Sequence, residues 1–454
     1  MTSRRSNRRY LVAAIALLST WPAAGFAQAT SAEATAAKPA VRLTLDEAIA
    51  QGVANSHRLA ELQAREDGAR AAESGRGAAR LPTVAAQAGY MRTNHVEEFA
   101  IAPPGQPRQI VYPDVPDNYR TRLDLQWLVY TGGRLDHLAR AARAEREATG
   151  EDLAAARADL RLDIARAFWT LVTAREADQV LTRSLDRIAA YVRDLKVRLD
   201  QGLIPPNELL SAEAQQARER VASIEAGNAR RIAEADLRRL TGIERAGEIE
   251  PAATLEPPAG QETEAARLIA EALQQRPERR ALTDRAEAAK ARVAAAAAER
   301  LPQIGVGGGF DYGRPNTRIF PRAARWEDSW DVSVNATWTL WDGGRMRADR
   351  AEAAAGARAA DARVADFDRQ VTFEVRQRQL ELDSSRAAIV AANEGVRAAA
   401  EARRVLGERF SAGVANNTEV LDAQTAMLQA ELDRTRALSN ARIAEARLVR
   451  ALGR

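Results

Sequence analysis

Two acidic side chains are the residues of this sequence best placed to act together. Glu419 and Asp422 lie three positions apart in the stretch FSAGVANNTEVLDAQTAML, residues 410–428. Positions three apart share one face of a helix, so both carboxylates are expected on the same face of a first helical turn. Two interpretations stay open. The acids stabilise the positive end of a helix dipole, by about 0.3–1 kcal/mol each, or several copies of the pair form a ring of negative charge.

Other residue types that could do chemistry are scattered. The three histidines, His57, His95 and His137, are far apart in the sequence and are expected to be ordinary surface residues. Four methionines, counting Met1, are too few for a methionine ladder that would carry copper or silver. No glycine-rich phosphate loop and no nucleophile–base spacing is present. We therefore expect no enzyme activity, no cofactor and no metal site.

The chain opens with a pattern typical of a secretory signal peptide. Four arginines within residues 1–9 precede a short apolar segment, residues 11–18. Small residues around Gly25 and Ala27 mark a cleavage site, so residues 1–27 are predicted to be the signal peptide. The mature chain is then expected to start near Gln28. The apolar segment is too short to be a transmembrane helix.

Charge and cysteine content exclude further classes of protein. The formal net charge is +4. Four arginines and no acids in residues 1–27 account for all of it, so the mature chain is neutral and gives no support for nucleic-acid binding. The 454 residues contain no cysteine, which excludes disulfides and a lipid-modified cysteine after the signal. Beyond the signal no run of 18 apolar residues occurs, so the chain can enter a membrane only as strands.

Three segments occur twice, in the same order, which indicates an internal duplication. LPTVAAQAGY begins at 81 and LPQIGVGGGF at 301, an offset of 220 residues. LQWLVYTGGR begins at 125 and ATWTLWDGGR at 336, an offset of 211. GLIPPNELLSAEA begins at 202 and GVANNTEVLDAQT at 413, again an offset of 211. The smaller offset indicates a shorter loop in the second copy.

Each copy is predicted to follow one plan: a helix, two strands, a very long helix, a glycine break and another helix. The first copy spans residues 28–241 and the second residues 264–454. Residues 242–263, with Pro251, Pro257 and Pro258, are predicted to be a linker. The first helices of the two copies are expected at about 43–79 and 264–300.

Strictly alternating apolar and polar residues predict the strands. Residues 119–129 place Leu123, Leu125, Trp127 and Val129 on one face and Arg120, Arg122, Asp124 and Gln126 on the other. Residues 330–340 alternate in the same way, and partner strands are expected near 83–97 and 303–313. The pattern suits a membrane β-barrel strand and also a half-buried strand of a soluble sheet. Aromatic residues at the strand ends favour the barrel, since they would form an interfacial girdle: Trp127, Tyr130, Trp338 and Trp341.

The long helices exceed what one globular core can cover. Residues 345–410 number 66, about 100 Å of helix at 1.5 Å per residue, and residues 134–201 match them in the first copy. Such rods must pack on each other as coiled coil. Each ends at a predicted hairpin tip, with Gly202 or Gly413 in the positive φ of a helix C′ position. In the second copy Thr418 is expected to cap the next helix.

Four strands cannot close a membrane barrel, because such barrels start at eight strands. Two copies would give eight strands filled by their own side chains, whereas three give twelve and leave a lumen. The predicted fold class is therefore an α+β membrane protein: a trimeric 12-stranded transmembrane β-barrel with a central pore, four strands per chain, with long α-helices packed as coiled coil.

This order of elements, with the motifs QGLIPPNELLSAEAQ and FSAGVANNTEVLDAQTAML, resembles the TolC-type outer membrane efflux family over residues 43–452. The absence of cysteine resembles its unlipidated branch. The resemblance implies a homotrimer in outer-membrane lipid with a helical tunnel in the periplasm. It also implies two partners, a periplasmic adaptor and an inner-membrane pump of the RND, ABC or MFS type.

The resemblance also implies roles for residues at the tips, which would form the periplasmic entrance. Glu419 and Asp422 match the family's two constricting aspartates, and Glu208, beside Asn207, matches an acid on the neighbouring tip. The family's gating tyrosine aligns with Phe410 and its gating arginine with Ala415. The family's bond network therefore cannot form here, and closure of the entrance must differ.

The function expected from the sequence is a passive exit duct of a tripartite efflux or type I secretion system, in the bacterial outer membrane and extending into the periplasm. The alternative is a structural or adhesive periplasmic coiled-coil protein without a pore.

Overall fold

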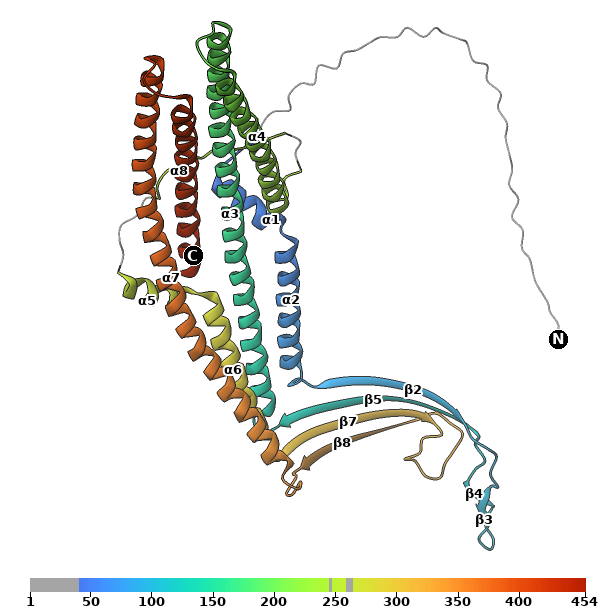
Figure 1. Cartoon of the computed structure of the whole chain (residues 1–454). Helices are drawn as coiled ribbons and strands as arrows, with labels where there is room; N and C mark the ends of the chain where they lie inside the picture. Colours follow the sequence, from blue (N-terminus) through green and yellow to red (C-terminus); the bar gives the residue numbers. More distant parts are fainter. Residues whose placement is uncertain (1–40, 245–246, 259–263) are drawn as a thin grey trace, which may run out of the picture. The chain divides into compact units, whose positions relative to one another are not determined.

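The computed structural model of this chain describes residues 41–244, 247–258 and 264–454, and its elements are drawn in Figure 1. These residues belong to one unit, Ala40–Arg454. The predicted signal peptide, residues 1–27, and the expected start of the mature chain at Gln28 lie outside the described residues.

Four long strands form one antiparallel sheet in the order β2–β5–β7–β8 (Figure 1). They are β2 (Thr83–Arg92), β5 (Asp117–Tyr130), β7 (Gln303–Arg314) and β8 (Glu327–Thr337). Each half of the chain contributes two of them, as predicted. The pairing of β5 with β7 joins the two halves in the centre of the sheet.

The register keeps the apolar and polar faces separate across all four strands. Leu125 of β5 pairs with Val84 of β2 and Gly308 of β7, and Gly308 pairs in turn with Val332 of β8. On the other face, Arg122 pairs with Gln87 and Asp311, and Asp311 pairs with Ser329. Because side chains alternate along a strand, the alternation seen in single strands gives one apolar and one charged face of the whole sheet.

Two strands end earlier than expected, and prolines directly before the partner strands explain both ends. The strand predicted over 330–340 stops at Thr337, the residue that pairs with Gln303. The strand predicted over 83–97 stops at Arg92, which pairs with Asp117. Each partner residue is preceded by a proline, Pro302 or Pro116, which has no N–H to continue the ladder.

The single helices expected at about 43–79 and 264–300 are each broken in two. The first half of the chain has α1 (Leu45–Asn55) and α2 (His57–Ala78), and the second half has α5 (Ala265–Gln275) and α6 (Pro277–Ala298). Ser56 separates the first pair, and its side chain caps α2 by accepting from the N–H of Leu59 at 3.3 Å. Pro277 starts α6, because proline suits the first helical position but not a helix interior.

The two very long helices are confirmed. They are α3 (Arg134–Asp200) and α7 (Arg345–Ser411), each of 67 residues, and each follows a glycine with positive φ. A turn joins α3 to α4 (Pro206–Thr241) and α7 to α8 (Asn417–Ala451). The result is two helical hairpins, and α3 also packs against α8 and α6.

The predicted linker, residues 242–263, is in part an ordered element of the core. It contains β6 (Ile249–Pro251), which pairs in parallel with β1 (Val41–Leu43). Ile249 is fully buried in a cluster with residues of α3 and α4, among them Ile164, Phe168 and Leu237. One apolar residue between charged neighbours is a weak sequence signal for a strand. Burial of Ile249 against the helices stabilises the strand here.

A second small addition was not predicted. The connection between β2 and β5 forms a hairpin of two short strands, β3 (Phe99–Ile101) and β4 (Gln109–Tyr112). Strands of three and four residues are too short to give a period-two signal.

Candidate functional site

The two hairpin tips have the same backbone turn. Gly202 has φ 72° and Gly413 has φ 74°, the left-handed conformation that favours glycine. The N–H of Leu203 donates to the carbonyl of Arg198, and the N–H of Val414 donates to that of Arg409, both at 2.9 Å. A six-to-one bond of this kind closes a Schellman motif. The glycine positions predicted from the repeat are thus correct.

The sequence predicts that Thr418 caps the helix after the second tip, but the structure shows that Asn416 caps it. The side chain of Asn416 accepts from the N–H of Glu419 at 2.9 Å, and Glu419 Oε2 accepts from the N–H of Asn416 at 3.3 Å. This reciprocal pair is a capping box. Asn416 can cap because its own backbone is extended, whereas Thr418 already lies inside the helix.

Glu419 and Asp422 are both exposed on α8, but only Glu419 lies in the first turn. Asp422 follows in the second turn. The capping bond occupies one carboxylate oxygen of Glu419 and leaves the other free for solvent or ions. Glu419 can therefore both stabilise the start of the helix and contribute to a ring of negative charge, whereas Asp422 has no part in the cap.

A small apolar cluster holds the two tips together. Its buried members are Leu195 of α3, Ala212 of α4, Phe410 of α7 and Val420 of α8. Ala415 packs against it. Phe410 and Ala415, the positions aligned with a gating pair, are thus brought to one cluster, and it is built of apolar contacts.

Polar contacts at this cluster involve residues that the sequence reasoning missed. The hydroxyl of Tyr191 on α3 donates to Asn417 Oδ1 at 2.7 Å, and Asn417 Nδ2 donates to the backbone carbonyl of Glu208 at 3.0 Å. Burial, and then the nearby charge of Glu208, raise the pKa of Tyr191, so its hydroxyl stays protonated. The sequence signal that could have identified Tyr191 is that it is an aromatic residue in a helix rich in Ala, Arg and Leu. The neighbouring Asn207 is exposed at the start of α4.

The four predicted interfacial aromatics lie where the strands meet the helices, and all are exposed. Trp127 Nε1 donates to the carbonyl of Arg80 at 2.9 Å, and Trp338 Nε1 donates to that of Arg300 at 3.1 Å. Tyr130 is 44% exposed and Trp341 86% exposed. Trp338 and Trp341 lie outside β8, beyond its end at Thr337.

The charged face of the sheet carries a cross-strand ion-pair network. Arg122 of β5 contacts Asp124 at 2.6 Å, Asp331 of β8 at 3.3 Å, and also Asp311 of β7. Its guanidinium lies over Gly309, where a Cβ would overlap it. Glycine in β7 therefore lets one arginine reach across three strands.

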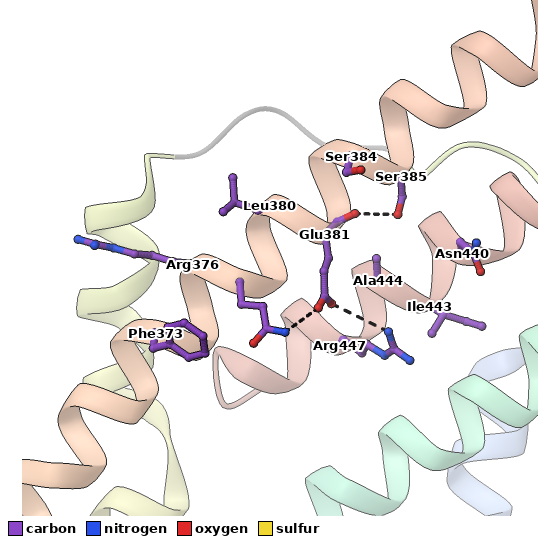
Figure 2. Close-up of a pocket in the computed structure, with 11 residues that line it drawn as sticks. Phe373, Arg376, Leu380, Glu381, Ser384, Ser385, Asn440, Ile443, Ala444 and Arg447 are labelled. Carbon is purple, nitrogen blue, oxygen red and sulfur yellow. Dashed lines mark hydrogen bonds and ion pairs between the residues drawn. The ribbon is translucent and has the colours of Figure 1, made fainter.

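A groove of about 870 Å³ lies between α7 and α8 (Figure 2). Phe373 and Leu380 on its α7 side are 70% and 69% exposed. Glu381, in the centre of Figure 2, accepts from Gln377 at 3.0 Å and lies 4.0 Å from Arg447 of α8. The charged side chain at the centre of the groove is therefore already engaged within the two helices.

Two kinds of feature are absent from the described residues. Within them no group of three or more His, Cys, Asp or Glu could hold a metal ion. In the same part of the chain no helix has the length and apolar character needed to cross a membrane.

Three solved structures share this fold over about nine-tenths of the chain. The first is a membrane protein from Pseudomonas aeruginosa, with 22% sequence identity and a TM-score of 0.76, and the match covers 90% of this chain and 93% of that one. The second is the outer membrane protein VceC from Vibrio cholerae, with 21% identity and a TM-score of 0.74 over 90% of this chain and 96% of that one. The third is the open state of the Neisseria gonorrhoeae MtrE outer membrane channel, with 20% identity and a TM-score of 0.73 over 90% of this chain and 88% of that one. Among curated proteins no sequence relative was found.

Sequence comparison with protein families gives a match over both halves of the chain. Residues 48–243 and 268–454 match the outer membrane efflux protein family. Residues 244–267, which separate the two matched segments, cover the connection from α4 to α5 and the start of α5. The chain therefore belongs to the outer membrane efflux protein family, whose members are outer-membrane channels that extend into the periplasm.

Proposed function

We propose that three copies of the chain assemble into a passive exit duct across the outer membrane. The four-stranded sheet carries this proposal, because it has one apolar face and its edge strands, β2 and β8, each pair on one side only. An open edge in lipid leaves backbone groups unpaired, so other copies must complete the sheet. Two copies fill an eight-stranded barrel with side chains, whereas three give a 12-stranded barrel with a lumen.

The helices continue this barrel as a coiled-coil tunnel through the periplasm. Helices of 67 residues, α3 and α7, are about 100 Å long, enough to carry the duct far from the membrane. An ancestral duplication, with repeats at 28–241 and 264–454 joined by 242–263, is supported by equal element lengths. The helices α1 and α5 have 11 residues each, and α2 and α6 have 22 each.

The duct works with a periplasmic adaptor and an inner-membrane pump, in efflux or type I secretion. Both tips offer the adaptor an exposed aliphatic side chain directly after the tip glycine. Leu203 is 68% exposed and Val414 is 63% exposed. The repeated geometry supports one docking mode used twice per chain. Replacement of both by Ser is expected to reduce adaptor binding in a pull-down without loss of assembled channel.

The tips form the periplasmic entrance, where Glu419 and Asp422 of three copies make rings of carboxylates. Their exposure on α8, next to the tip, supports this placement. Confined carboxylates attract cations and repel anions. The resting pore should therefore be cation-selective and blocked by multivalent cations from the periplasmic side.

Planar-bilayer recording of the wild type and of Glu419→Ala/Asp422→Ala tests this assignment. The double variant should lose much of its cation preference and of the trivalent-cation block, with normal assembly. Identical reversal potentials and block in both proteins would show that the acids act only on the helix. Because Ala at 419 also removes the capping box, Glu419→Gln/Asp422→Asn serves as a variant that keeps hydrogen-bonding capacity without charge.

Assembly itself is tested by light scattering of the purified protein in detergent. A trimer, and single-channel currents in bilayers, are expected. A stable monomer without currents would instead favour a pore-less periplasmic coiled-coil protein.

A further inference from the structure

Gly309 of β7 lies between two aspartates of the neighbouring strands. It pairs with Asp124 of β5 on one side and with Asp331 of β8 on the other. Directly paired residues point to the same face of a sheet, so the two carboxylates flank the space above the glycine. The guanidinium of Arg122 occupies that space, where it contacts Asp124 at 2.6 Å and Asp331 at 3.3 Å. Any side chain at position 309 would stand in the place of this guanidinium.

Glycines continue along the same face of β7 at Gly307 and Gly305. A Cβ at Gly307 would lie 2.9 Å from Ser333 Oγ, so a side chain of β8 also leans over this strand. Gly308 points to the apolar face, where the nearest atom to a Cβ would be the backbone oxygen of Asp331 at 3.7 Å. The close contacts of the β7 glycines are thus on the charged face, over which a hollow of about 580 Å³ remains.

The charges on this face are balanced. Six charged residues of the four long strands lie on it: Arg120, Arg122, Asp124, Asp311, Glu327 and Asp331. The connection between β7 and β8 adds two arginines, since Arg318 contacts Asp331 at 3.0 Å and Arg325 contacts Glu327 at 2.6 Å. These four arginines and four acids, here called the ion-pair belt, have no formal net charge.

Arg122 decides whether the charges of the ion-pair belt cancel locally. It contacts three of the four acids, Asp124, Asp311 and Asp331. Opposite charges in contact largely cancel each other a few ångströms away, whereas separated charges do not. The cancellation therefore requires that the guanidinium lies flat against the sheet, and the absence of a side chain at Gly309 makes this possible.

We propose that Gly309 determines the charge specificity of the barrel. By leaving room for Arg122 between the carboxylates, it keeps the lumen wall electrically balanced, so that anionic and cationic solutes pass this part of the duct equally well. Charge selection is then left to the tips, where Glu419 and Asp422 lie. This inference rests on the proposed function, because only a closed barrel turns the charged face of the sheet towards a lumen.

A single introduced thiol can report the potential beside the ion-pair belt. The chain has no cysteine, so Gln126→Cys provides the one thiol of the protein. Gln126 is exposed on the charged face and pairs with Gly307, next to the row of Gly309. The measurement is the rate of reaction with a cationic methanethiosulfonate divided by the rate with an anionic one of similar size, at low ionic strength. This rate ratio is then compared with that of a small free thiol, and a balanced wall should keep the two within about threefold of each other.

Two glycine variants in the Gln126→Cys protein test the role of position 309. In Gly309→Ala the new methyl group displaces the Arg122 guanidinium towards the lumen, so the rate ratio should fall by about threefold. Gly308→Ala is the matched control, because it makes the same change at the next residue on the opposite face, and it should leave the ratio unchanged.

Removal of the guanidinium tests the same idea with the opposite sign. Arg122→Gln leaves one unbalanced negative charge per chain beside a confined lumen, so the rate ratio should rise by about tenfold. Gly309→Ala added to Arg122→Gln should give the ratio of Arg122→Gln alone, because no guanidinium is left to displace. Arg122→Gln keeps the glycine, so it tests the belt even where alanine at position 309 lowers the yield.

The outcomes separate this inference from the duct itself. A stable monomer in light scattering contradicts the proposed function, and the inference falls with it. In a trimer, a Gln126→Cys rate ratio more than about threefold from that of the free thiol overturns the balanced wall and leaves the duct intact. An unchanged ratio in Arg122→Gln also overturns it. Equal ratios in Gly309→Ala and Gly308→Ala, or an effect of Gly309→Ala that persists without Arg122, would show that Gly309 does not act through this guanidinium.

Discussion

Two glycines in neighbouring helices should respond to alanine with opposite signs. Gly52 lies in α1 and Gly68 in α2, and both are in helix interiors. Alanine at a helix interior is favoured over glycine by about 0.8–1 kcal/mol. At Gly68 a new Cβ meets nothing within 4 Å, so Gly68→Ala should stabilise the protein by about that amount.

At Gly52 the same methyl group has no room. Its Cβ would lie 2.9 Å from the backbone oxygen of Leu240 and closer still to the Cδ1 of Ile164, which is itself fully buried. A backbone atom cannot rotate away, so α1 must shift from α3 and α4. Overpacking of this kind costs about 1–3 kcal/mol. After the gain in helix propensity, Gly52→Ala should be destabilising by up to about 2 kcal/mol.

The difference between the two variants isolates the overpacking, because the helix-propensity gain is common to both. It should be about 1–3 kcal/mol. Urea unfolding followed by far-ultraviolet circular dichroism, under conditions where refolding is reversible, measures it. Equal midpoints for Gly52→Ala and Gly68→Ala would refute the close packing of α1 on the core, and with it the anchoring of the helices around Ile164.

Two further predictions concern the sheet and the buried charges. Leu125→Arg should cost about 2–4 kcal/mol if Leu125 faces lipid near the mid-membrane, whereas Gln126→Arg on the charged face should be tolerated. The yield of assembled protein in outer-membrane fractions compares them, and equal yields would contradict the assignment of faces. Burial disfavours ionisation of Glu278, but the hydrogen bond and charge of Arg450 outweigh it and hold the pKa of Glu278 below its usual range. The ionised form of Glu278 therefore stabilises the folded protein above the unfolded pKa, and this stabilisation is lost as pH falls through the folded pKa. Glu278→Gln should accordingly destabilise the protein at neutral pH. The difference in unfolding midpoint between this variant and the wild type should shrink below about pH 4.

The sequence by itself determined the repeating elements of this protein. Alternation through Leu123 and Leu125 identifies β5 and its two faces, because the period of a strand is set by local backbone geometry. The long helices and the turns at Gly202 and Gly413 follow in the same way, since proline-free runs and positive-φ glycines act within a few residues. The acids Glu419 and Asp422 could be placed on α8 for the same reason.

Only the tertiary structure decided which side chains meet across the two hairpins. Asn417 and Tyr191 are 226 residues apart, and nothing in either local sequence marks them as partners. The strand at Ile249 likewise forms because β1 and the helices around it bury that side chain. Gly52 and Gly68 look alike in the sequence and differ only in what lies opposite them. Contacts between distant segments depend on burial and packing, which a local pattern does not encode.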